Sequence, residues 1–198
     1  VVAVASVTSV GFFANRVRDY VYTVSRDEDG DGFADRVNDE GELDPEGELL
    51  FQQFTQAGAT FQGMEAELRW RPEGSPWSVR LFADQVRGKL SVGGNLPRMS
   101  PTRFGASLEG RSGRASGWLS ATRVKEQDRV AELETATSGY TRVDAEAAWR
   151  LGEGRRGLVV FLQGTNLLDR DMRVHTSYLK DLAPLMGRSW LLGARGEF

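Results

Sequence analysis

The sequence predicts an all-β protein, a transmembrane antiparallel up-and-down β-barrel segment of about eight strands. Apolar and polar residues alternate with a period of two through most of the 198 residues. The segments between these runs are short and long in turn, as in barrels with tight turns at one end and longer loops at the other. The final run, 187–198, also alternates and ends on Phe198, which is typical of the closing strand of an outer-membrane barrel.

Eight stretches have the alternation of strands and end at turn-forming residues. The first stretch starts without a Met, a basic region or the cleavage site of a signal peptide, so we expect the chain to be a piece of a longer protein. The stretches span about residues 4–23, 51–70, 77–90, 101–111, 115–126, 139–151, 157–168 and 188–198.

Several of these stretches have one apolar side and one polar or charged side. In 139–151, Val143 and Trp149 share one side, while Asp144 and Glu146 lie on the other. The same pattern holds in 63–71 and 101–111, in 77–84 apart from one residue, and in 188–198, where the second side is mostly polar or small. Two strands depart from it.

The departures are aromatic. Phe82 falls on the charged side of its strand, and Phe12 and Phe13 fall on opposite sides of the first strand. The first strand is therefore ambiguous in its orientation.

The connections predict which end of the barrel faces outward. Short ones are 71–76, 111–114 and 152–156, and long ones are about 24–50, 91–100, 127–138 and 169–187. With the C-terminus on the periplasmic side, every long connection lies outside. The aromatic residues Trp70, Trp77, Trp149 and Phe198 lie beside short turns or the terminus, as expected for an interfacial girdle.

The composition excludes several classes of protein. The net charge of −3 is small and mixed in sign, so we expect no nucleic-acid partner. No apolar run has the length of a membrane-spanning helix. The absence of cysteine excludes disulfides and thiolate metal sites, and the single histidine excludes a multi-histidine zinc site.

Two other readings of the alternation stay open. A soluble β domain would use the same pattern with its apolar side turned inward, and its charges would face water. A small closed outer-membrane barrel of about eight strands, with a structural or adhesive role, is also a permitted size. An isolated open segment would leave backbone donors unpaired in lipid at both edges, which costs several kcal/mol for each group.

Residues 27–38 (DEDGDGFADRVN) have the spacing of a calcium-binding loop. Gly32 provides the sharp turn, and Asn38 stands where a bidentate Glu would strengthen the site. No flanking helices are expected, so a free-standing loop is the better comparison, and a solvated acidic loop is the alternative. The candidate Ca²⁺ ligands are Asp27, Asp29, Asp31, the Phe33 carbonyl, Asp35 and Asn38.

His175 lies in the last long connection and is a weak candidate for ligand contact. A loop histidine with a local hydrogen bond is the favoured reading, because one imidazole alone is a poor metal site. No nucleophile, base and orienting group can be assembled from the spacing, so we do not expect an enzyme.

Five stretches resemble TonB-dependent outer-membrane receptors. The last of them is most similar to a branch that includes zinc-uptake receptors. The motifs occur in the order expected over residues 51–198. They are residues 56–68 (QAGATFQGMEAEL), 95–105 (NLPRMSPTRFG), 134–144 (ETATSGYTRVD), 164–169 (GTNLLD) and 173–188 (RVHTSYLKDLAPLMGR).

The resemblance implies a ligand-gated importer in the outer membrane of a Gram-negative bacterium. Its complete barrel would have about 22 strands around an N-terminal plug. Energy would come through the TonB complex, and the cargo would be a scarce nutrient, a metal or metal chelate. Residues 1–198 would then be the C-terminal part of the barrel, with outer-membrane lipid on one side and the missing plug and strands as partners.

Overall fold

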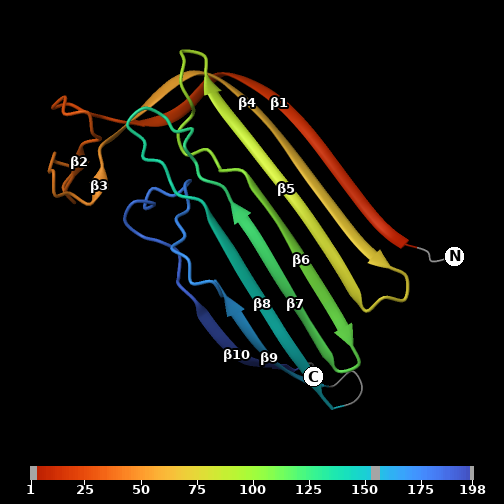
Figure 1. The fold of residues 1–198 in the computed structure, drawn as a ribbon. Coiled ribbons are helices and arrows are strands. Elements are labelled where there is room, and N and C mark those ends of the chain that lie inside the picture. The colour runs from red at the N-terminus through yellow and green to blue at the C-terminus, as the bar shows by residue number, and fades with distance from the viewer. Residues whose placement is uncertain (1–3, 153–156, 197–198) are drawn as a thin grey trace.

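One large antiparallel sheet forms the body of the protein (Figure 1). The computed structural model describes residues 4–152 and 157–196. The strands are β1 (Val4–Ser25), β2 (Arg36–Val37), β3 (Leu49–Leu50), β4 (Gln52–Pro72), β5 (Trp77–Leu90), β6 (Arg103–Ser112), β7 (Ala115–Val124), β8 (Tyr140–Leu151), β9 (Leu158–Thr165) and β10 (Ser189–Gly196).

The eight long strands pair in chain order, so the sheet has the up-and-down topology that the sequence predicts. The order is β1-β4-β5-β6-β7-β8-β9-β10, with every neighbouring pair antiparallel. β1 and β10 are the two edges, so the sheet is open within the described residues. This finding does not support a small barrel closed by the eight strands of this chain.

The predicted strand boundaries agree closely with the structure. The connection between β1 and β4 contains one feature that the alternation did not indicate, a small two-stranded sheet in which Arg36 pairs with Leu50 and Val37 with Leu49. Part of the predicted turn 152–156 and the end of the closing strand, including Phe198, lie outside the described residues.

The two ends of the sheet differ in the length of their connections. We call the end with residues 73–76 and 113–114 the turn end. The opposite one, with 26–51, 91–102, 125–139 and 166–188, is the loop end, at the upper left of Figure 1. In the described part of the chain, no helix is long and apolar enough to cross a bilayer.

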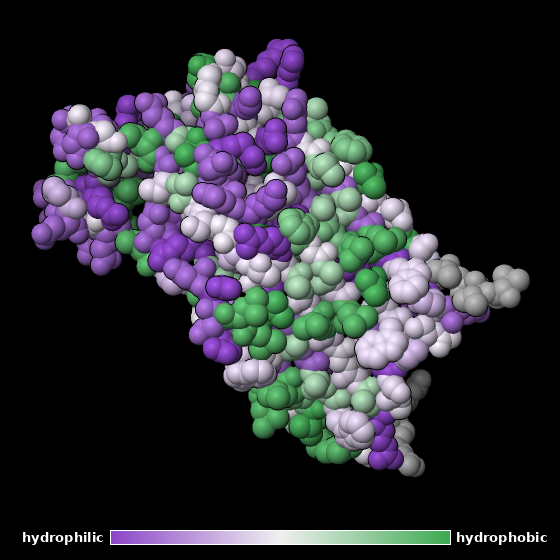
Figure 2. Space-filling model, in the orientation of Figure 1, coloured by the Kyte–Doolittle hydropathy of each residue, from purple (hydrophilic) through white to green (hydrophobic). Residues whose placement is uncertain are grey.

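The apolar sides of the strands join into one continuous surface. Leu68 pairs with Leu81, and Leu108 pairs with both Val79 and Leu119. These side chains do not pack in an interior: Trp149 is 52% exposed and Leu192 is 74% exposed. Figure 2 shows hydrophobic side chains gathered over the sheet and hydrophilic ones over the loop end.

This exposure argues against a soluble domain. That reading places the apolar side in a sealed centre, where Leu108, Trp149 and Leu192 would be buried. Leu108 is 39% exposed, and the other two are more exposed still. A contiguous apolar surface of this extent is expected to be covered by lipid or by another chain.

The aromatic residues that break the alternation have a packing role. Phe13 pairs directly with Gly63, and Phe82 pairs directly with Gly105. A Cβ added at Gly63 would lie 2.4 Å from the Phe13 ring, and one at Gly105 would lie 2.7 Å from the Phe82 ring. Each ring therefore covers a glycine on the neighbouring strand, a device that fixes strand register.

Most of the buried side chains among the described residues lie at or near the loop end. The largest fully buried side chains all belong to the long connections or border them. They are Leu96, Gln127, Asn166, Met172 and His175. The long connections therefore pack together into a folded assembly.

Candidate functional site

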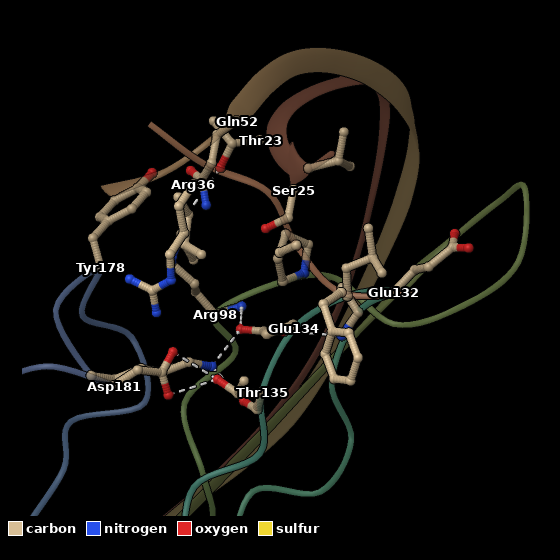
Figure 3. A pocket seen from close by; sticks show the side chains of 18 of the residues that line it. Thr23, Ser25, Arg36, Gln52, Arg98, Glu132, Glu134, Thr135, Tyr178 and Asp181 are labelled. Atoms are coloured by element: carbon tan, nitrogen blue, oxygen red, sulfur yellow. Dashed lines mark hydrogen bonds and ion pairs between the residues drawn. The ribbon is translucent and has the colours of Figure 1, made fainter. Parts of the chain in front are cut away.

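All four long connections meet around one pocket at the loop end (Figure 3). Its volume is about 470 Å³. Arg36 comes from the first connection, Arg98 from the second, Glu134 from the third and Tyr178 from the last. Segments far apart in sequence thus build a single concave surface, which is the usual form of a small-ligand site.

Glu134 joins three of these connections. Its carboxylate accepts hydrogen bonds from the backbone N–H of Arg98 at 2.9 Å and of Ala131 at 3.0 Å. The Nζ of Lys180 donates to the same group at 3.2 Å and to the Thr135 carbonyl at 2.6 Å. Because the Glu134 and Lys180 side chains are 9% and 5% exposed, water screens this ion pair little.

These contacts set the protonation of Glu134. Burial raises the pKa of its carboxyl, but the adjoining His175 imidazole, the two backbone N–H groups and the Lys180 charge outweigh burial and lower the pKa to about 2. Glu134 is therefore a carboxylate at any physiological pH.

His175 does not line the pocket but contacts Glu134, which does. The side chain is buried; its Nδ1 lies 3.0 Å from the Thr137 hydroxyl and its Nε2 lies 3.2 Å from Glu134. The structure thus places the single histidine against the Glu134 network, where it packs the last connection against the third. Its predicted contact with a ligand stays a prediction.

Arg98 presents its guanidinium to the pocket in a fixed position. The group stacks over the Tyr178 ring at 3.3 Å from the centroid, and Nη1 donates to the Thr23 hydroxyl at 3.0 Å. The backbone of Arg98 has a φ of 54°, a value that residues other than Gly and Asn rarely adopt. Leu133, also in the pocket wall, has a φ of 57°. Such strain persists where the surrounding contacts over-determine it, and it gathers at binding sites.

The candidate calcium loop brings some of its predicted ligands together. Carboxylate oxygens of Asp27, Asp29 and Asp35 all lie within 4.8 Å of one another, the one such acidic cluster among the described residues. Asp31 instead accepts a hydrogen bond from the Phe33 backbone N–H. The Asn38 amide oxygen accepts from the N–H groups of Glu40 and Glu42, so it is engaged in the following turn.

Phe33 belongs to the acidic loop and also lines the pocket. Its side chain is 74% exposed, and the residue lines the pocket together with Gly32 and Ala34. The acidic loop therefore forms one wall of the pocket.

The charged side of the sheet carries paired ions. Glu67 contacts Arg80 at 2.6 Å and also contacts Arg69. Asp84 contacts Arg103 at 3.0 Å. Arg142–Asp144 and Arg195–Glu146 continue the pattern. A polar, charge-balanced wall of this kind suits a hydrated lumen.

Sequence reasoning did not find the residues that organise the pocket. Glu134 and Arg98 lie inside the stretches 134–144 and 95–105, but those stretches indicated the starts of strands rather than a contact between connections. The only local signal was Lys180 in a polar segment with His175 and Asp181. Contacts across 36 to 46 residues of chain leave no trace in a local pattern.

Comparison with known proteins agrees with this architecture. The structure of the copper transporter OprC is similar, with a TM-score of 0.74 and 18% sequence identity over 96% of this chain. At that identity the likeness shows the fold alone. The chain spans 27% of the length of that transporter. Residues 5–167 match the family described as TonB dependent receptor-like, beta-barrel, and the chain belongs to that family.

Proposed function

We propose that this chain is the C-terminal part of the barrel of a receptor that imports a scarce nutrient across the outer membrane of a Gram-negative bacterium. The family match over residues 5–167 is the observation that carries the proposal. The exposed apolar side of the sheet would face lipid, and the ion-paired side would face a hydrated lumen. The role is binding and passage of a ligand, not catalysis.

The rest of the receptor would complete the barrel. β1 and β10 are open edges, and hydrocarbon does not tolerate unpaired backbone donors, so further strands must cover both. A plug within the barrel and the TonB complex in the inner membrane would gate and energise transport. The short share of the copper transporter that this chain covers is consistent with such an arrangement.

The cargo we propose is a metal chelate rather than a bare ion. Three carboxylates line the pocket at the loop end. Glu134 already accepts several hydrogen bonds and Asp181 accepts one from Thr135, so within the described residues Glu132 alone among them is uncommitted, and one carboxylate is too few to hold a bare metal ion. The pocket wall also offers the Arg98 guanidinium and the Tyr178 ring. Such a lining suits an organic ligand that supplies its own metal-binding atoms. The copper transported by the structural neighbour favours a metal cargo.

Uptake by cells tests this function. A strain that lacks the full receptor gene, complemented with the receptor or with its Arg98→Ala variant, is given radiolabelled copper or zinc as free ions and as chelates. We expect chelate uptake that needs both the receptor and TonB, and that falls at least about tenfold in the variant, because a hydrogen bond to a charged group contributes about 1.5–3 kcal/mol.

A matched variant keeps this result interpretable. Arg129→Ala changes an arginine in the third connection that does not line the pocket, and it should transport like the unaltered receptor. Uptake that is independent of the receptor, or of TonB, would contradict the proposal.

A further inference from the structure

We propose that the lipid-facing side of this sheet carries a basic belt that binds the phosphate-bearing headgroups of the outer leaflet. The inference rests on the lipid-facing orientation proposed above and not on the cargo. The basic belt consists of Arg16, Arg87, Lys89, Arg123 and Lys125.

The strand register places these cations on the apolar side. Arg87 pairs with Gln62, which lies two residues along β4 from Met64 and therefore on the same side. Arg16 and Lys89 both pair with Thr60, so they flank one position on neighbouring strands.

The other two cations continue the belt at β7. Arg123 pairs with Phe104, on the same side as Ala121, two residues along the strand. Lys125 lies two residues beyond Arg123, so the alternation of the strand places it on the same side. Its backbone N–H donates to the Thr102 carbonyl just beyond β7. All five side chains of the belt are exposed.

The belt lies at the level expected for the outer headgroups. Trp70, which pairs with Val79, and Trp149, which pairs with Ala115, mark the turn end of the apolar surface. Arg87 lies eight residues along β5 from Val79, and Arg123 lies eight along β7 from Ala115. Eight residues of strand span about 26 Å. At a tilt of about 40° this is about 20 Å of height, and the apolar band of such barrels is about 25 Å tall.

The charges of the belt have one sign and lack acidic partners. Arg16, Arg87, Lys89 and Lys125 make no ion pair with any residue that the structure describes, and Arg123 donates only to the Thr141 hydroxyl. The paired strand positions at this level on this side carry Gln, Thr, Ala or Phe and no carboxylate. On the opposite side of the sheet, by contrast, cations such as Arg80 and Arg103 are paired with acids.

Phosphate is the chemistry that fits this surface. A charged residue facing hydrocarbon is costly, but long Arg and Lys side chains can bury their stems and extend their charges to the headgroup level. Guanidinium groups bind phosphate oxygens through paired hydrogen bonds. Each lysine or arginine near an anionic membrane surface contributes about fivefold to binding.

Lipid binding by the purified full receptor tests the inference. The probe is dioleoyl phosphatidic acid, whose headgroup is a phosphomonoester, and the comparison lipid is phosphatidylcholine with the same acyl chains. Binding in neutral detergent is measured by native mass spectrometry. The test variant is Arg87→Gln/Lys89→Gln/Arg123→Gln. The control variant is Arg71→Gln/Arg111→Gln/Arg150→Gln, which removes three cations from the other side of the sheet at the turn end.

We expect the unaltered receptor and the control variant to prefer phosphatidic acid and the test variant to lose between about tenfold and a hundredfold of that affinity. Millimolar inorganic phosphate should not displace the lipid. Equal lipid binding by the test variant, an equal loss in the control variant, or displacement of the lipid by free phosphate would each overturn the inference.

Discussion

Glu134 shows how one residue can order several loops. It has no neighbour in sequence that would mark it as special, yet its carboxylate holds backbone groups of two connections and the ammonium group of a third. A buried carboxylate with these partners is far more stable ionised than protonated. The shape of the pocket should therefore depend on the charge of this single side chain.

The Glu134→Gln variant should loosen the loop end. Gln keeps the shape of Glu but not the charge that faces Lys180, so we expect hydrogen-exchange protection of the Arg98 and Ala131 amides to fall roughly tenfold or more. The control is Glu132→Gln, a neighbouring exposed carboxylate in the same pocket wall, which should leave protection unchanged.

The same contact predicts a pH dependence. The pKa of Glu134 is about 2 in the folded protein, below its ordinary value of 4.5, so its stabilising effect is complete above about pH 4.5 and is lost as the pH falls toward 2. Protection corrected for intrinsic exchange should follow this course in the unaltered protein and stay flat in the Gln variant. A flat course in both would contradict the role of Glu134.

At the scale of elements, the strands could be predicted and the loop contacts could not. The register of a strand can be predicted from its own sequence. Apolar and polar residues alternate with a period of two, so a slip by one residue would move every side chain to the opposite side of the sheet. Phe82 breaks the period, and nothing local explains this, because the explanation is Gly105 on the next strand. The pair β2 and β3 is too short to show a period. The pocket depends on contacts such as Lys180 with Glu134, which only the folded chain brings together.

The acidic loop is the element whose predicted function is most directly testable. With Asp27, Asp29 and Asp35 already close together, Ca²⁺ should order the connection between β1 and β4. We expect Ca²⁺ to slow proteolysis of this connection, and a chelator, or the Asp27→Asn/Asp29→Asn variant, to abolish the effect.

The control for this element is Glu46→Gln/Glu48→Gln, which removes two carboxylates from the same connection outside the acidic cluster and should keep the response to Ca²⁺. Identical digestion of the unaltered protein with and without Ca²⁺ would end the calcium hypothesis. The affinity expected is in the millimolar range, because Asn38 replaces the strongest ligand of the usual loop.

At the scale of the whole molecule, the two sides of the sheet differ in polarity and its two ends differ in packing. The apolar side of the sheet is exposed, the opposite side carries balanced ion pairs, and the buried residues gather at the loop end. A sheet of this kind has no interior of its own. It becomes stable only when lipid covers one side and the rest of a barrel closes its edges. The proposed import function and the proposed basic belt both depend on this orientation.

Single nitroxide labels on β6 and β7 of the full receptor, in outer-membrane vesicles, test the orientation most directly. Residues 1–198 contain no cysteine, and any cysteine elsewhere in the receptor is first replaced by serine. Labels at Ala106, Leu108 and Leu119 should collide readily with oxygen, which dissolves in hydrocarbon, whereas labels at Ser107 and Ser120 should not. An alternation with a period of two, highest at the apolar positions, is the predicted result. Equal accessibility at all five positions, or the reverse alternation, would show that the apolar side does not face lipid.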